Sequence, residues 1–163
     1  MNYEEWEKSV PEAIKGDTLW KVEVYRLGLL LSDLAWYDTT KLMRDKRTLD
    51  LAGQLYEAVG SVSANVAEGY SRGSNKDRAR FYEYSLGSAR ESRDWYYKGR
   101  HVLGEQVTDH RLRFLVSVIR LLLKMVPEQR GHALHDERAL YQINEDSAVA
   151  ELNELLRNIP LSD

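Results

Sequence analysis

The sequence contains no cysteine, only 3 prolines, and no apolar run long enough to cross a membrane. Without cysteine, neither a disulfide framework nor thiolate chemistry is available. The longest aliphatic blocks, at 27–31 and 115–126, fall well short of the ~20 residues that span a bilayer. The acidic start of the chain lacks the pattern of a signal peptide. We therefore expect a cytoplasmic protein that does not bind membranes.

Four segments space their apolar residues by four and three, which is the pattern of amphipathic helices. They predict helices at about 18–42, 49–70, 75–103 and 108–126, and Pro127 is expected to end the fourth helix. Asp17 and Ser74 are suitable N-caps. The expected core residues are Trp20, Val24, Leu27, Leu31, Leu34, Leu51, Leu55, Val59, Val62, Val66, Tyr82, Leu86, Ala89, Tyr96, Leu103, Leu112, Val116, Ile119, Leu123 and Val126.

Helices joined by short connections run antiparallel to their neighbours. The sequence therefore predicts an all-α fold, an antiparallel up-down-up-down four-helix bundle over residues 17–127. Residues 1–16 are expected to be an N-terminal extension, and 128–163 a tail with a short amphipathic helix at about 147–159. Leu152 and Leu156 lie on the apolar side of that short helix, which would dock on the bundle or clasp a neighbouring subunit.

Small and polar residues stand in the second and third helices where a packed core would favour leucine. Each glycine inside a helix costs ~1 kcal/mol relative to alanine, so Gly53, Gly60 and Gly87 suggest a close approach of two backbones. Asn65 and Glu68 lie one turn apart. The same holds for Ser88 and Glu91 in the next helix. Our hypothesis is that these side chains pair across the hairpin or with amides near its turn, and the alternative is a solvated polar face.

Residues 51–91 resemble the signature of the 23S rRNA intervening-sequence proteins, in which a Q…A..S…N-[IV]-A-E-G hairpin leads into F…L-G-S..E. The matching positions are Gln54, Ala58, Ser61, Asn65, Ala67, Glu68, Gly69, Phe81, Leu86, Gly87, Ser88 and Glu91. The resemblance implies a four-helix bundle that assembles into a ring, typically a pentamer. It also implies kinship with the accessory proteins of diversity-generating retroelements, which bind nucleic acid and a reverse transcriptase.

Positive charge is unevenly distributed in a chain whose net charge is −3. Residues 71–113 hold ten Lys or Arg against six Asp or Glu, and in an up-down bundle the first and third connections fall at one end. A ring would repeat that end as a basic rim able to contact phosphates. The candidate nucleic-acid contacts are Lys41, Arg44, Lys46, Arg47, Arg100, Arg111 and Arg113. The alternative is that these cations are solvated helix ends with local partners.

No catalytic motif survives inspection. GYSRGSNK at 69–76 has neither the spacing nor the preceding strand of a phosphate loop, and GSVSA at 60–64 lacks the final glycine of a nucleophile elbow. His132 and His135 are metal-ligand types, but their polar, glycine-containing surroundings favour a linker. We expect no enzyme activity, no cofactor and no metal site.

Aromatic residues are too numerous for one core stripe. Tyr84 and Trp95 lie off the predicted inner stripe, where they would widen the core, stack on bases or, as we favour, form a subunit contact. The sequence therefore predicts a non-enzymatic, ring-forming helical scaffold or binding module. Its partners are predicted to be itself, as a pentamer, and RNA, DNA or a nucleic-acid-processing protein. The alternative function is a self-assembling structural or regulatory protein that touches no nucleic acid.

Overall fold

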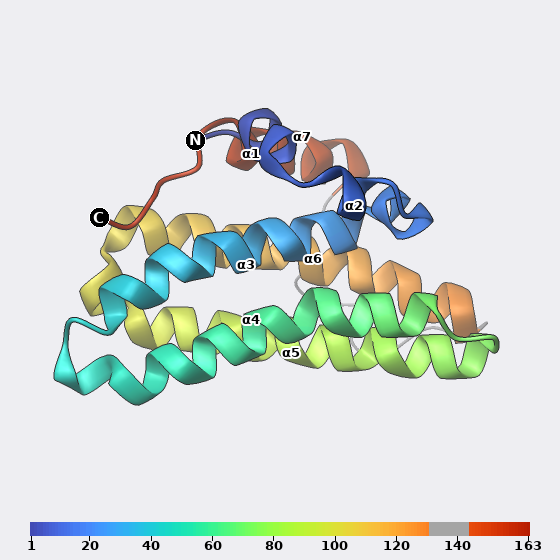
Figure 1. Ribbon diagram of the computed structural model, residues 1–163, viewed down its shortest axis with the longest axis horizontal. Coiled ribbons are helices and arrows are strands. Elements are labelled where there is room, and N and C mark those ends of the chain that lie inside the picture. Colours follow the sequence, from blue (N-terminus) through green and yellow to red (C-terminus); the bar gives the residue numbers. More distant parts are fainter. Residues whose placement is uncertain (131–143) are drawn as a thin grey trace.

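A computed structural model describes residues 1–130 and 144–163 of the chain. Its body consists of four long helices, α3 (Glu23–Leu42), α4 (Leu49–Tyr70), α5 (Asn75–Leu103) and α6 (Glu105–Arg130). Figure 1 shows them lying side by side along one axis. The described residues contain no strand, so the all-α prediction is confirmed.

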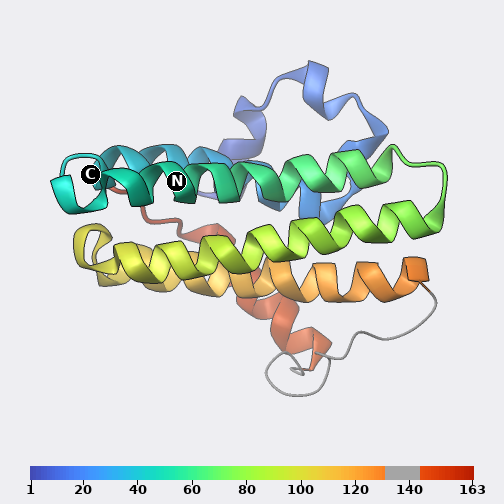
Figure 2. The ribbon, with the colours of Figure 1, turned by 90° about the horizontal axis from the view of Figure 1, so that it is seen from below.

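The order of the helices in space follows their order in the chain. Helix α3 packs on α4, α4 on α5 and α5 on α6, whereas α3 and α6 have far fewer close contacts. The α3–α4 connection, which contains the short 3-10 helix η2 (Lys46–Thr48), lies at the same end as the α5–α6 connection (Figures 1 and 2). The α5–α6 connection is Gly104 alone, with φ 89°, a value that favours glycine. The up-down-up-down topology is as predicted.

The core confirms the whole predicted stripe of α5, from Tyr82 to Leu103. In α3 and α4 the predicted residues from Val24 to Leu34 and from Leu55 to Val66 are buried, whereas the predicted Trp20 and Leu51 are only half-buried. The stripe of α6 is partly wrong, because Leu112 and Val116 are only half-buried while Leu115 and Val118 are fully buried. When apolar residues cover a broad face of a helix, the sequence does not determine which side of that face points into the core. In α6, packing against α5 determines it.

The N-terminal extension belongs to the same core. Helix α1 (Tyr3–Ser9) is followed by α2 (Glu12–Lys15) and the 3-10 helix η1 (Thr18–Lys21). Trp6 is 4% exposed, stacks on Trp20 with ring centroids 6.1 Å apart, and its Nε1 donates to Asp33 at 2.6 Å. The sequence did not predict that Trp6 belongs to the core, because a single tryptophan in a short helix gives no periodic pattern.

Three predicted helix boundaries need correction. Asp17 caps η1 rather than the first long helix, which begins only at Glu23 after the extended residue Val22. Pro127 does not end α6, which continues to Arg130. Helix α7 (Glu145–Arg157) lies two residues earlier than the predicted 147–159. Proline removes only one backbone N–H, so a helix already held by packing can continue through it.

Helix α7 docks on the bundle of its own chain. It packs against α6, and Leu152 and Leu155 are 9% and 5% exposed. After α7, residues 158–163 run without helix beside α3 and α6 toward the end of the bundle that carries η2 (Figure 1). Of the two placements left open for the tail helix, docking on its own bundle is the one observed.

Candidate functional site

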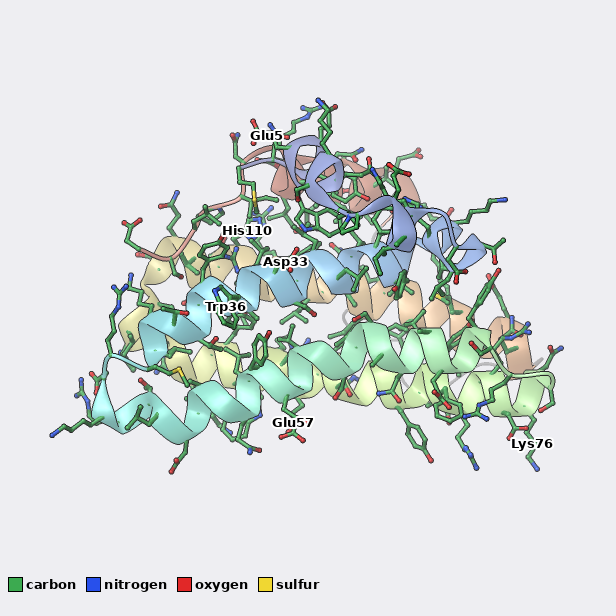
Figure 3. All side chains as sticks on the ribbon, viewed as in Figure 1. Glu5, Asp33, Trp36, Glu57, Lys76 and His110 are labelled. Atoms are coloured by element: carbon green, nitrogen blue, oxygen red, sulfur yellow. The ribbon has the colours of Figure 1, made fainter. Side chains whose placement is uncertain are left out.

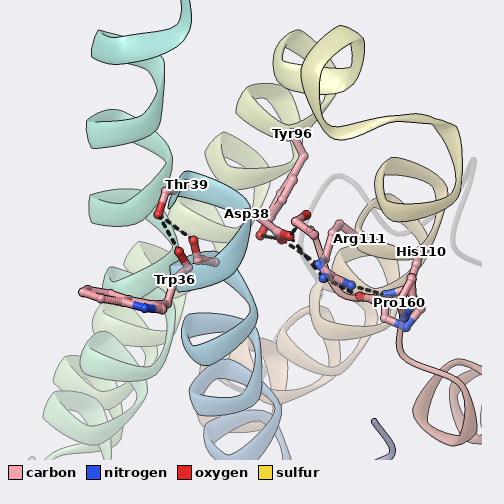
Figure 4. Close-up of polar contacts among 9 residues, drawn as sticks. Trp36, Asp38, Thr39, Tyr96, His110, Arg111 and Pro160 are labelled. Carbon is pink, nitrogen blue, oxygen red and sulfur yellow. Dashed lines mark hydrogen bonds and ion pairs between the residues drawn. The ribbon is translucent and has the colours of Figure 1, made fainter. Parts of the chain in front are cut away.

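The most developed polar arrangement is a buried ion pair between α3 and α6. Asp38 and Arg111 both have side chains that are 0% exposed, and the Nε of Arg111 donates to Oδ2 of Asp38 at 2.7 Å. A second bond joins Nη2 of Arg111 to Oδ1 of Asp38 at 3.3 Å. The Tyr96 hydroxyl on α5 donates to the same carboxylate at 2.9 Å (Figure 4). Three helices of the bundle therefore meet at one carboxylate.

His110 completes the arrangement on the other side of the guanidinium. Its Nε2 lies 3.0 Å from the carbonyl oxygen of Leu155, and its Nδ1 lies 2.9 Å from Nη1 of Arg111. Since the carbonyl only accepts and the guanidinium only donates, the ring is neutral with its proton on Nε2. Burial, together with the nearby Arg111 charge, lowers the pKa of His110 to about 4.

The C-terminal residues supply the remaining partners of the ion pair. Nη2 of Arg111 donates to the carbonyl of Pro160 at 2.8 Å, and the Ser162 hydroxyl donates to Oδ1 of Asp38 at 2.6 Å. The backbone oxygen of Asp163 accepts from Arg44 at 3.1 Å. We call Asp38, Tyr96, His110 and Arg111 the buried polar cluster.

The buried polar cluster joins α3, α5 and α6 through an ion pair and hydrogen bonds. A buried charge is tolerated only when paired and hydrogen-bonded, and here both charges meet that condition. Burial also raises the pKa of Tyr96 well above its ordinary value, and the Asp38 charge adds to this rise, so the hydroxyl stays protonated as a donor. No group in the cluster is both exposed and poised to transfer a proton.

Sequence reasoning missed this cluster and assigned Arg111 to nucleic-acid contact. That prediction is wrong, because Arg111 is completely buried. A signal was present, since Leu27, Leu31, Leu34 and Asp38 continue one spacing of four, three and four. A carboxylate at the next core position of a helix requires a buried cation, and only the register of α6 identifies it.

The other predicted nucleic-acid contacts are scattered over one end of the bundle. Arg47 is exposed and pairs with Asp45, whose pKa is well below its ordinary value because of the hydrogen bonds from Arg47. Arg100 donates to the Tyr97 carbonyl and stacks on that ring at 4.1 Å. Arg113 pairs with Glu151 of α7 at 3.2 Å. Lys41 is half-buried, and Lys46 is exposed.

Three polar residues of the hairpin signature, Asn65, Glu68 and Glu91, make their hydrogen bonds close by in the sequence. Asn65 donates to the Ser61 carbonyl of its own helix at 2.8 Å, Glu68 pairs with Arg72, and Glu91 accepts from Trp95 at 3.3 Å. These bonds stay within one helix or its turn, so for these side chains the predicted pairing across the hairpin is wrong.

The rest of the signature is divided between the surface and the helix contacts. Gln54 and Gly87 are exposed, and Ser61 and Ser88 are half-buried. The Ser85 hydroxyl, which sequence reasoning did not select, crosses the hairpin to the Val62 carbonyl at 2.8 Å.

The glycines of the bundle serve two different purposes. A Cβ on Gly69 would lie 2.8 Å from the Tyr82 ring, and one on Gly28 3.0 Å from Ser63, so these two permit close packing. A Cβ on Gly53, Gly60 or Gly87 would meet no atom of residues 1–130 or 144–163 within 4 Å. The predicted packing role of these three within the subunit is therefore wrong.

A group of large apolar side chains is exposed beside the open glycines. Trp36 on α3 is 62% exposed and meets Tyr56 of α4 edge-on, with ring centroids 6.2 Å apart. Met43 and Leu49, at the end where these helices join, are 58% and 47% exposed. In Figure 3, Trp36 lies on the side of α3 that faces α4, and Glu57 points away from the bundle. We call Trp36, Met43, Leu49 and Tyr56, with Gly53 and Gly60, the α3–α4 face.

The predicted interface residues behave differently from one another. Tyr84 is 51% exposed, as a contact residue would be. Trp95 is half-buried against the core, with Lys98 over its ring at 4.2 Å. Leu152 is buried within its own subunit and Leu156 is partly buried against the core, so neither is free to clasp a neighbour.

An open groove of about 440 Å³ lies between α5, α6 and α7. Arg90, Arg93 and Arg113 line it together with Tyr97, which is 54% exposed. Asp94 and Glu151 also reach its walls, so the groove carries a small excess of positive charge. Arginine and an exposed ring are the side chains that hold phosphates and bases.

Within residues 1–130 and 144–163, no three or more His, Asp or Glu side chains gather as a metal site would need. His132 and His135 lie outside the described residues. None of the described helices is long and apolar enough to cross a membrane.

The fold is that of a small antiparallel helical bundle, and its outer surface carries the α3–α4 face and the arginine-lined groove. The family described as 23S rRNA-intervening sequence protein matches residues 21–124. The chain belongs to this family, and the match covers all four long helices except the last turn and a half of α6. No similar protein was found among curated proteins or among solved structures.

Proposed function

We propose that this protein is a self-assembling helical scaffold that acts by binding rather than by catalysis, and that the α3–α4 face is a contact between its copies. The carrying observation is the exposure of Trp36 and Tyr56 beside two helix glycines with open space around them. Contiguous exposed apolar side chains on a soluble chain mark an interaction surface.

The open space at the two glycines of α4 would allow a helix or another backbone segment of a second copy to pack closely against the α3–α4 face. Gly53 and Gly60 lie two turns apart on α4, and each costs ~1 kcal/mol of helix stability that no contact with the described residues of the subunit offsets. Aromatic rings are favoured at the centres of protein interfaces. A ring, such as the pentamer that the sequence resemblance implies, requires a second and different face on each subunit. Exposed Tyr84 on α5 is our candidate for that face.

Light scattering on the full chain tests self-assembly. We expect a mass several times the 18.9 kDa of one chain, and five times for the pentamer. The double variant Trp36→Ser/Tyr56→Ser should lower that mass or raise the concentration needed for assembly. Tyr97→Ser is the matched control, because Tyr97 is equally exposed but lies on α5 away from this face. A mass near 18.9 kDa at micromolar concentration would refute the proposal.

The second candidate function is nucleic-acid binding, which the groove of Arg90, Arg93 and Arg113 favours. Backbone phosphates would lie along the arginines, and a base would stack on exposed Tyr97. We expect single-stranded RNA or DNA to be retained at low salt and lost steeply as salt rises, because binding releases counterions.

A charge reversal in the groove separates this candidate from self-assembly. Arg93→Glu should abolish retention, whereas Lys76→Glu at the far end of the bundle (Figure 3) should change it little. If neither RNA nor DNA is retained at 50 mM salt, a regime in which such binding is strong, the scaffold works without nucleic acid. The mass of the particle should be the same with and without the charge reversal.

A further inference from the structure

The last residues of the chain are seated on the buried polar cluster in the manner of a bound peptide. Residues 158–163 have no helical structure, and Ile159 is 4% exposed. The Pro160 carbonyl accepts from Arg111 at 2.8 Å, and the Ser162 hydroxyl donates to Asp38 at 2.6 Å. Leu161, between them, is 40% exposed. One carbonyl and one hydroxyl therefore contact the ion pair, and one apolar side chain enters the core.

The receiving groups are organised without help from these residues. Asp38 already accepts from Nε and Nη2 of Arg111 and from the Tyr96 hydroxyl. The ring nitrogen of His110 holds the third nitrogen of the guanidinium. The tail adds one bond to each member of the ion pair, so the geometry that recognises it is set by α3, α5 and α6, with α7 orienting His110 through the Leu155 carbonyl. Preorganised charged groups bind a ligand with little loss of entropy.

Receptor and occupant also differ in their relation to the family. Asp38, Tyr96, His110 and Arg111 all fall within residues 21–124, the part that matches the family. Pro160 and Ser162 fall outside it. The receptor residues thus lie inside the matched range, and the occupant lies outside it.

From this arrangement we propose that the buried polar cluster is a binding site for a short peptide of the form apolar–Pro–x–Ser, and that residues 159–163 occupy it as a tethered, releasable ligand. The apolar residue enters the core beside α1, where the Ile159 amide donates to the Met1 carbonyl at 3.0 Å. The proline carbonyl binds Arg111, and the serine hydroxyl binds Asp38. This site is independent of the α3–α4 face and of the proposed assembly.

Peptide binding to a chain that ends at Asn158 tests the proposal. That chain keeps α7 and the whole family bundle. The probe is a fluorescein-labelled peptide with the sequence of residues 157–163, RNIPLSD, followed by fluorescence anisotropy. We expect saturable binding to the shortened chain and at least tenfold weaker binding to the full chain, whose own tail competes at a millimolar effective concentration. The peptide with Ser162→Ala should bind at least fivefold more weakly than the unchanged peptide.

Equal binding of the two peptides, or equal binding to the shortened and full chains, would overturn the proposal. Loss of cooperative unfolding in the shortened chain would also overturn it, because a segment required for folding is not the ligand of a built site. A second measurement uses the full chain, in which carboxypeptidase should release the C-terminal residues several-fold faster from Ser162→Ala than from the control Leu161→Ala. Equal rates for these two variants would again contradict a site that recognises the hydroxyl.

Discussion

Replacing Asp38 by asparagine keeps the shape of the side chain and removes its charge. Arg111 is then a buried cation without a counterion, at 0% exposure. Breaking a buried pair in this way costs about 3–5 kcal/mol. We expect about 3 kcal/mol, the lower end, because the amide oxygen of asparagine still accepts one of the bonds that Arg111 and Tyr96 donate. At roughly 2–4 °C for each kcal/mol in a chain of this length, Tm should fall by about 6–12 °C.

Urea unfolding followed by circular dichroism measures the loss, and Asp94→Asn is its matched control. Asp94 pairs with Lys98 at 2.5 Å, but its side chain is 58% exposed, so its loss should cost less than about 1 kcal/mol. The double variant Asp38→Leu/Arg111→Met should be more stable than Asp38→Leu alone, because it leaves no unpaired charge. If Asp38→Asn lies within 1 kcal/mol of the unchanged chain, roughly the control's own expected change, the buried pair does not have the role described.

Two further predictions concern pH and glycine. Because the pKa of His110 is lowered to about 4 in the folded chain, the unfolded chain binds this proton more readily between pH 6.5 and 4. The free energy of unfolding should therefore fall by about 3 kcal/mol as pH drops through that window, and His110→Gln should show a shallower slope; equal slopes would contradict this. Gly53→Ala should stabilise the monomeric bundle by up to about 1 kcal/mol, whereas Gly69→Ala should destabilise it against the Tyr82 ring. Thermal unfolding that moves both variants in one direction would contradict the second prediction.

The outer face of α4 shows how far the sequence could be interpreted. The helix glycines Gly53 and Gly60 led to the prediction of a close approach between α4 and α5, which is wrong for both of them. Gly69 meets Tyr82 of α5, while Gly53 and Gly60 meet no residue of the described chain. Periodicity identifies the side of a helix that carries small residues, and it does not say what lies opposite them.

The sequence by itself determined the four long helices and their up-down order. Apolar spacing sets which residues can be buried together, and short connections allow only antiparallel neighbours. The structure adds that the chain reverses between α5 and α6 at Gly104, with φ 89°.

Only the tertiary structure decided which charged residues are inside. Asp38, Arg111 and Ser162 are separated by 73 and 124 positions along the chain, counted from Asp38, and no local pattern relates them. The rotation of α6 about its axis and the seating of the C-terminal tail bring them together. Arg111 and Arg113 look alike in the sequence, yet a turn of 200° between them places one in the core and the other beside Glu151 at the surface. Burial is a property of the packed helix face, so charge type and position in the sequence alone could not assign it.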